Sequence, residues 1–343
     1  SMMQYIRYMK INYPPKVQML FMVSAGSPIS FSFGINMPSF VEDKLVDAPL
    51  PDAFDKYDIN SNFVNNLWDL LITLFMILLA ILGLALLTVA SKKFPKVNGI
   101  FGRMLEAVKW NFPVMMVCGA SGDIFFYASL QLRSAPLDNV SSIICFAICL
   151  LMMISVLVVL WISWKIIKNF DRQRRNPEDG DWKDKWKDYG ILYEEHEEKS
   201  IWAFSFMLLF ILRGLVVNLT LANLENYPMI QSIILNVVNL SIFSYFLYLR
   251  PLKSFLGVVQ LFVNEGLVNI LGISIMILAI MDKAGIKGQS TRLSVGEAIL
   301  FVIKTFNTFG LVFMALGMLV NLITLFKIWR DFRKRGIKNP LKM

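Results

Sequence analysis

Three ionisable residues lie in apolar stretches of the sequence, where an isolated charge is unfavourable. Arg213 is in the middle of "LLFILRGLVVNLTLANL", and Asp123 and Glu265 are in two other apolar runs. A charge at the centre of a bilayer costs at least about 2.5 to 3.5 kcal/mol on insertion scales, so each side chain should be paired or face water. Such groups either hold helices together or line a pathway for ions or substrate, and the residues alone leave both interpretations open.

The composition shows which elements must position these charges. The chain has 343 residues, of which 56% are hydrophobic and 17% charged, and its mean hydropathy is +0.57. This is too apolar for a soluble globular domain. The apolar runs are continuous and do not alternate, so they predict helices and exclude a β-barrel. We therefore predict an all-α, polytopic membrane protein.

Seven segments are long enough to cross about 30 Å of hydrocarbon, which takes roughly 20 helical residues. They are Leu67–Ala90, Phe112–Leu132, Val140–Trp164, Ile201–Leu221, Tyr227–Leu249, Phe255–Met281 and Ala298–Phe326. The implied organisation is a pre-membrane segment (1–62), three spans (63–167), a charged loop (168–200), four spans (201–326) and a basic tail (327–343).

The distribution of Lys and Arg predicts the orientation. The connections after spans one, three and five and the C-terminal tail carry 23 of the 34 basic residues. The N-terminal segment and the other connections carry 9, and the last two are Arg213 and Lys304. Because basic residues are enriched on the cytosolic side, we expect the N-terminus to be extracellular or lumenal and the C-terminus cytosolic.

In this orientation the three buried charges reach a similar depth. Arg213 lies 12 residues beyond Ile201, about 18 Å along a helix, and Asp123 and Glu265 lie 11 and 10 residues into their spans from the same side. We predict an ion pair of Arg213 with Glu265 or with Asp123. Lys304, near the outer end of the seventh span, is placed to extend its amine towards the membrane surface.

The pre-membrane segment has two parts. "SMMQYIRYMKINY" has helical spacing of apolar residues, and we expect Pro14 and Pro15 to end that helix. The following stretch, rich in Pro, Ser and Asp, is predicted to be an ordered outer cap because it contains several phenylalanines; a disordered linker is the alternative. Because this segment must cross the membrane and no signal peptide precedes it, we expect upstream residues that include an extracellular region.

The charged loop and the tail are predicted to be cytosolic. The loop is interpreted either as solvated chain or as a short interfacial helix anchored by Trp182 and Trp186. His196 among four glutamates is weak evidence for a metal, and we predict none. We expect the tail to touch anionic membrane lipid and not nucleic acid. Its candidate lipid-contacting residues are Arg330, Arg333, Lys334 and Arg335.

No motif in the chain indicates catalysis. The GxSxG, GxxxxGK[ST] and HExxH patterns are missing, and the chain has a single histidine. We therefore predict a protein without catalytic residues or cofactors. Two spans favour close helix contact, which is usually ordinary packing. Separately, we expect a homo-oligomer or hetero-oligomer. Span two carries "CGASGD", which ends in Asp123, and span seven carries Asn307, Gly310, Gly317 and Asn321.

The sequence resembles the TRP-like membrane domain of large ciliate membrane proteins, which is distantly similar to fungal TRP-like and flavin-carrier proteins and to polycystins. The likeness covers nearly the whole chain, through "YIRYMKINYPPKVQMLF", "FDKYDINSNFVNNLWDLL", "KDYGILYEEHEEKSIWAFSFMLLFILRGLVVNL", "YFLYLRPLK" and "VNEGLVNI". It implies a domain related to cation channels, with an extracellular region before it. The positions that match the family pattern are Arg213, Tyr248, Arg250, Pro251 and Glu265.

The sequence departs from a TRP channel in the last connection. A tetrameric pore uses a re-entrant helix and a filter there, but "DKAGIKGQSTRLSVGE" is short and basic, and the seven spans exceed the usual six. Three functions remain open: a cation channel subunit, a transporter of small molecules or lipids, and a membrane anchor or structural subunit of a surface assembly.

Overall fold

The computed structural model describes residues 6–24, 35–42, 45, 49–51, 54, 57, 59–134, 139–176, 182–286 and 288–334. Within these residues, seven helices are long and apolar enough to cross a membrane, at the positions that the sequence predicts. They lie in α6 (Trp68–Ala90), α7 (Pro95–Lys109) with α8 (Asn111–Ser134), α9 (Val140–Arg175), α12 (Phe206–Asn223), α13 (Pro228–Leu249), α14 (Phe255–Lys283) and α15 (Gln289–Lys334). The predicted all-α, seven-span fold is confirmed, and the chain is a multi-pass membrane protein.

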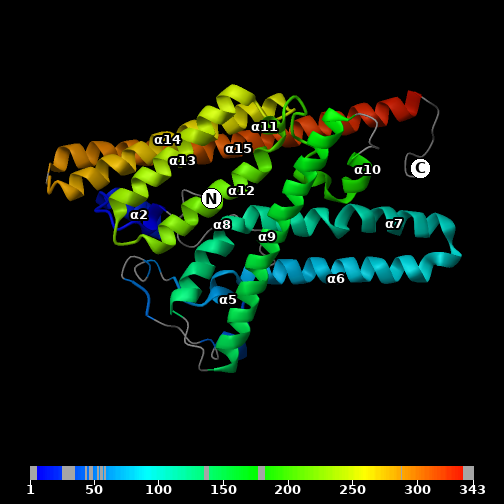
Figure 1. Cartoon of the computed structure of the whole chain (residues 1–343), viewed down its shortest axis with the longest axis horizontal. Coiled ribbons are helices and arrows are strands. Elements are labelled where there is room, and N and C mark those ends of the chain that lie inside the picture. The colour runs from blue at the N-terminus through cyan, green and yellow to red at the C-terminus, as the bar shows by residue number, and fades with distance from the viewer. Residues whose placement is uncertain are drawn as a thin grey trace.

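Helices α6 and α7 form an antiparallel hairpin that projects away from the α13–α14 pair (Figure 1). The short 3-10 helix η2 (Ser91–Lys93) ends α6, and Pro95 begins α7, because a proline at the first helical position needs no amide partner. The connection after span one is therefore largely helical. The chain then enters α8 after a break at Trp110.

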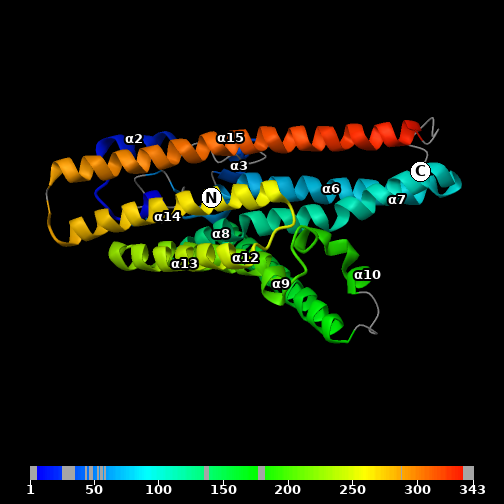
Figure 2. The ribbon, with the colours of Figure 1, turned by 90° about the horizontal axis from the view of Figure 1, so that it is seen from above.

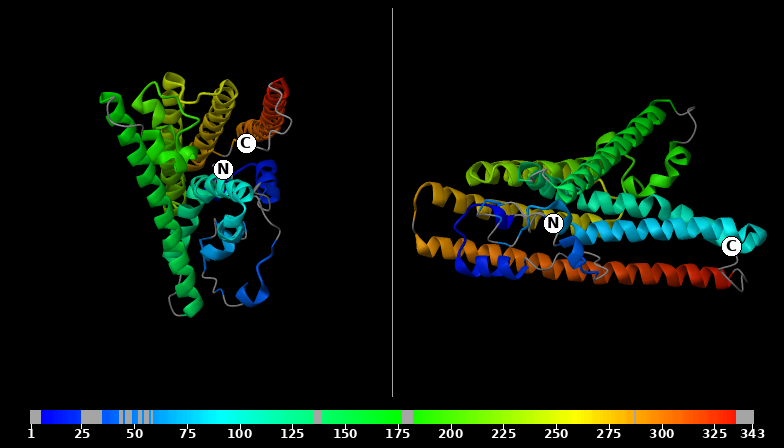
Figure 3. Two further views of the ribbon diagram at one scale, coloured as in Figure 1. Left: turned by 90° about the vertical axis from the view of Figure 1, so that its right-hand side faces the viewer. Right: turned by 90° about the horizontal axis from the view of Figure 1, so that it is seen from below.

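Helix α14 lies between α13 and α15, as Figure 2 shows from above. Helix α9 crosses the other long helices steeply, and both views in Figure 3 show this. Helix α9 extends past its predicted end to Arg175, and α15 runs from Gln289 to Lys334, well beyond its predicted start and end. Much of the predicted connection before the last span is therefore helix. Residues 284–288 are all that separates the end of α14 from the start of α15.

Two hydrophobic cores share the bundle. One core joins the ends of α8 and α12 to α13, α14, the first turns of α15 and the N-terminal segment. The other joins α5 (Phe63–Asn66), α8, α9, the start of α12 and the loop around Leu192. Because α8 and α12 contribute to both cores, they connect the two halves of the molecule.

The predicted N-terminal helix is wrong within the described residues. A 3-10 turn, η1 (Ile6–Tyr8), is followed by extended chain, and Pro15 begins α2 (Pro15–Ser24) instead of ending a helix. The apolar spacing had a different cause: Ile6, Tyr8, Met9 and Tyr13 are buried in the first core as an irregular segment. Residues 1–5 lie outside the described part of the chain. Part of the predicted cap also lies outside it, but Phe54 and Tyr57 pack in the same core.

Candidate functional site

Arg213 is held by one residue from each of the two following helices. Its Nη1 donates to Glu265 Oε1 of α14 at 2.6 Å, and its Nε and Nη2 donate to Asn239 Oδ1 of α13 at 3.2 and 3.0 Å. All three residues are buried, with exposed fractions of 8%, 4% and 0% for Arg213, Glu265 and Asn239. The pairing of Arg213 with Glu265, one of the two predicted alternatives, is present and connects α12, α13 and α14.

Asn239 was not predicted as a partner, although it is an amide inside a predicted span. Amides in apolar spans often bond across helices, and this would have been the signal to use. A further bond connects α13 and α14, because Asn236 Nδ2 donates to Gly272 O at 2.9 Å. Within α14, Asn269 Nδ2 donates to Glu265 O at 2.8 Å. Gly272 lets α13 approach, because a Cβ there would lie 2.8 Å from Asn236 Oδ1.

Asp123 contributes to a second group at the N-terminal segment. Its charge acts on the hydroxyl groups of Tyr8 and Tyr127, and the Arg7 guanidinium, which acts on the same hydroxyls, donates to Tyr8 Oη. Burial is the main cause that raises the pKa of Tyr8, so this hydroxyl stays protonated at neutral pH. The three predicted charges therefore lie in two groups of contacts: Arg213 and Glu265 in one, and Asp123 in the other.

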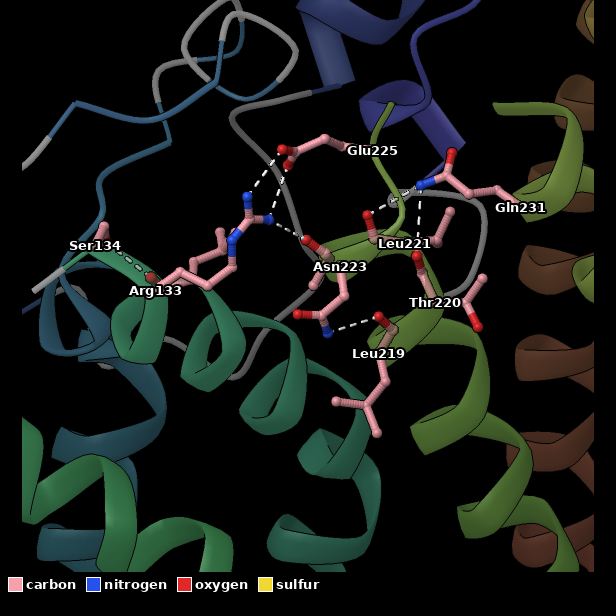
Figure 4. A network of polar contacts seen from close by, with 10 residues as sticks. Arg133, Ser134, Leu219, Thr220, Leu221, Asn223, Glu225 and Gln231 are labelled. Atoms are coloured by element: carbon pink, nitrogen blue, oxygen red, sulfur yellow. Dashed lines mark hydrogen bonds and ion pairs between the residues drawn. The ribbon is translucent and has the colours of Figure 1, made fainter. Parts of the chain in front are cut away.

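The small residues of span two allow close contact between α8 and α12. A Cβ on Gly122 would lie 2.1 Å from Asn218 Nδ2 of α12, so only glycine fits without a shift. At the ends of the same helices, Arg133 and Glu225 point towards each other (Figure 4), with Nη1–Oε2 and Nη2–Oε1 at 3.0 and 2.9 Å. Arg133 also donates to Ala222 O. This two-pronged pair was not predicted from the sequence, although both residues flank predicted spans.

Lys304 lies apart from these groups, exposed on α15. Among the described ion pairs none includes it, and its predicted extension towards the surface remains a prediction. Of the predicted lipid-contacting residues, Arg330 is exposed on α15, and Arg333 and Lys334 belong to the last turn of that helix. Arg335 lies outside the described residues, and the lipid contact stays a prediction.

The predicted cytosolic loop folds over the C-terminal end of α9 and the start of α12. Trp182 and Trp186 begin and end α10 (Trp182–Trp186), but Trp182 is buried against Phe170, Tyr193 and Phe204. Of the two interpretations of this loop, the short helix is present, and its first tryptophan packs on protein. Its contact with the membrane interface stays a prediction. His196 is also buried, next to Phe206, and not exposed among its neighbouring glutamates. No group of three or more metal-ligating residues occurs in the described chain.

Two backbone hydrogen bonds clamp this loop to the connection between α13 and α14. Glu197 N donates to Pro251 O at 2.8 Å, and Lys253 N donates to Glu195 O at 3.0 Å. Arg250 ends α13 with a φ of 44°, a left-handed conformation that turns the chain towards the loop. Two of the family-pattern positions therefore have a structural role here, whereas Tyr248 is exposed.

The clamp should loosen at low pH through His196. Burial is the main cause that lowers the pKa of this imidazole to about 4; the charge of Lys253 acts in the same direction, and a backbone hydrogen bond at Leu192 opposes it. An unfolded histidine titrates near 6.5, so the open loop binds more protons below that pH, and acid destabilises the clamp. We expect a loss of about 2 kcal/mol by pH 5.

This loss is measurable as faster amide exchange of residues 187–200 between pH 7 and pH 5, after correction for the intrinsic pH dependence of exchange. The variant His196→Phe keeps an aromatic ring in the pocket and removes the titrating group, so its clamp should show no such change. An equal pH response in both proteins would contradict the assignment to His196.

Seven apolar helices, three of which are connected by buried polar side chains, define a multi-pass helical membrane domain. A sequence model described as "Transient receptor potential (TRP) ion channel" matches residues 55–340. The chain belongs to this family, which confirms the resemblance. Comparison with curated proteins and with solved structures gave no match.

Proposed function

We propose that the chain is the membrane domain of a cation channel subunit, and that several copies assemble with α15 lining the conducting pathway. The observation that carries this proposal is the uncovered state of α15. Only 17% of an apolar 18-residue stretch of this helix is buried; α6 is even less covered, at 11%, but its sequence contains no amide side chain. Family membership supports the same function.

One face of α15 is unsuited to lipid. Polar and small residues recur there at helical spacing, with Met314 between them: Asn307, Gly310, Gly317, Asn321 and Thr324. All are at least partly exposed, and a Cβ on Gly310 or Gly317 would meet nothing within 4 Å. Amides exposed to hydrocarbon are costly, so this face is better satisfied by water or by another copy of α15.

The pathway differs from a pore with a filter loop. The connection between α14 and α15 is too short for a re-entrant helix, and it is closed by an ion pair between Arg292 at the start of α15 and Asp282 at the end of α14, at 2.6 Å. Amide oxygens of Asn307 and Asn321 are then the polar groups available to a passing ion. We therefore expect cations to pass with little discrimination among them.

Cysteine cross-linking tests the arrangement. In the proposed assembly, Asn321→Cys should cross-link between copies under mild oxidation, whereas Leu319→Cys, exposed on the opposite face of α15, should do so several-fold less. The natural cysteines are buried, which keeps the background low.

The wild-type protein should also run as a homo-oligomer and carry cations across liposomes. A monomer without flux would contradict the channel and favour an anchor, and flux by a monomer would favour a transporter. Equal cross-linking of the two variants would contradict the proposal that the Asn321 face of α15 lies between copies.

A further inference from the structure

Four buried side chains of α12, α13 and α14 each have one polar atom without a hydrogen-bond partner among the described residues. These atoms are Asn218 Oδ1, Gln231 Oε1, Asn239 Nδ2 and Glu265 Oε2. The exposed fractions of the four side chains are 6%, 0%, 0% and 4% in the same order. Buried polar atoms in proteins are nearly always paired, either with protein groups or with ordered water, so four such atoms on three neighbouring helices need a common explanation.

The unpartnered atoms follow the contact between α12 and α13. Two bonds fix the register of these antiparallel helices: Arg213 Nη2 donates to Asn239 Oδ1 at 3.0 Å, and Gln231 Nε2 donates to Leu221 O at 3.1 Å. The two bonds are eight residues apart on both helices, which is about 12 Å. Asn218 lies between these levels on α12. The line therefore runs from the middle of the bundle to the last turn of α12, which the Gln231 amide reaches (Figure 4).

The deeper level has two unpartnered atoms beside one guanidinium. Asn239 Oδ1 and Glu265 Oε1 both accept from Arg213, so the second atoms of the same amide and carboxylate also lie next to it. One of these second atoms is a donor and the other is an acceptor. A water molecule can accept from the amide and donate to the carboxylate at the same time. A metal cation would satisfy only the oxygen, and the charge of Arg213 would repel it.

Aromatic side chains lie on the other side of Arg213, towards the ends of these helices that are predicted to be cytosolic. The Phe210 ring centre lies 6.0 Å from the guanidinium, and the rings of Phe243 and Phe262, from α13 and α14, lie 5.7 Å apart. Phe246 of α13 is only 2% exposed. Water between these helices therefore has polar partners on the outer side of Arg213 and meets apolar rings on the cytosolic side.

We propose that bound water molecules lie between α12, α13 and α14, bridge the four unpartnered atoms, and form an aqueous half-pathway that opens at the outer end and stops at the Arg213–Glu265 pair. The half-pathway lies within one chain, so it depends neither on assembly nor on conduction along α15. It gives water and protons access to Glu265 from the outer side of the membrane only.

Silver ions test the access in the detergent-solubilised chain, because Ag⁺ is small enough for a narrow aqueous path and binds thiolates tightly. Asn218→Cys places a thiol in the half-pathway, and Val217→Cys places one in the apolar first core, where Val217 is 2% exposed. We expect Ag⁺ to react with Asn218→Cys at least about tenfold faster than with Val217→Cys. Mass spectrometry of the thiols that can still be alkylated after denaturation gives both rates. Equal rates would overturn the half-pathway.

A second pair of variants serves if Asn218→Cys does not fold. Ser232→Cys changes a single atom of a side chain that is 0% exposed and shares a face of α13 with Asn236 and Asn239. Its control is Ala279→Cys in the first core, where Ala279 is 2% exposed. The Ser232→Cys thiol should again react faster, and equal protection of the two thiols from Ag⁺ would contradict the proposal.

A single-particle structure of the solubilised wild-type protein, at a resolution that shows ordered water, tests the site directly. We expect a solvent peak within about 3.2 Å of both Glu265 Oε2 and Asn239 Nδ2, and further peaks at Asn218 and Gln231. Well-resolved side chains that pair directly with protein groups, with no solvent between Gln231 and Glu265, would overturn the site. A file of solvent peaks that continues past Arg213 to Phe246 would overturn the one-sided access.

Discussion

Replacing Glu265 by Leu is expected to destabilise the solubilised protein by about 3 to 5 kcal/mol. This change leaves the buried Arg213 guanidinium without the carboxylate that lies 2.6 Å from it. Removing one partner of a buried ion pair costs this much because the remaining charge stays out of water. The measurement is the midpoint of unfolding in a denaturant titration of the purified protein.

A double variant separates the charge from the packing. In Arg213→Met with Glu265→Leu no uncompensated charge remains, so most of the lost stability should return. The control is Arg175→Gln, which breaks an ion pair at a side chain that is 74% exposed and should cost less than about 0.5 kcal/mol. A Glu265→Leu protein as stable as this control would contradict a tight buried pair.

The same double variant distinguishes the two roles that the charges could have. If the pair only holds α12, α13 and α14 together, the double variant assembles and carries ions at the wild-type rate. If the pair belongs to a pathway, the variant folds but its flux falls. Asn239 gives a third probe, because Asn239→Leu removes the acceptor for Nε and Nη2 and keeps the carboxylate.

Two kinds of feature could be predicted from the sequence: the spans, which depend on the length of apolar runs, and the buried ion pair, which depends on the cost of an unpaired charge in the membrane. Seven apolar runs gave seven spans, and the depth of Arg213 and Glu265 placed them within reach of each other. Counting residues does not give the rotation of each helix about its axis, and the choice between Glu265 and Asp123 depends on it. Asn239 was missed for the same reason, since an amide inside a span shows its partner only once the helix faces are known.

The N-terminal segment could not be predicted from local patterns. The apolar spacing of Ile6, Met9 and Tyr13 fits a helix, yet these residues pack in an irregular segment among α8, α12, α14 and α15. Tertiary packing overrides the local periodicity here, because the contacts with the neighbouring helices bury these side chains without the segment forming a helix. A Cβ at Gly296 of α15 would lie 2.6 Å from Pro14 Cγ, so this glycine makes the close approach possible.

Tyr8→Ala is the second change with a large expected effect, a loss of about 3 to 5 kcal/mol in the free energy of unfolding. Only 1% of Tyr8 is exposed, and its ring stacks on Phe126 of α8 at 5.3 Å and meets Phe54 and Tyr57 at 5.8 Å. Truncating a fully buried aromatic side chain removes these contacts and leaves a cavity. The readout is again the unfolding midpoint of the solubilised protein.

Tyr8→Phe is the matched control, since it keeps the ring and removes only the hydroxyl, which accepts from Arg7 and is also hydrogen-bonded to Tyr127. It should cost about 2 kcal/mol, within the usual range for a hydrogen bond to a charged group. If the segment merely rested on the outer surface, Tyr8→Ala would cost no more than about 0.5 kcal/mol. A large loss would instead mean that the pre-membrane segment is part of the bundle. Any force on the segment would then reach α15 through Pro14 and Gly296, and through Asn12, which accepts from Arg292 and donates to Asp282.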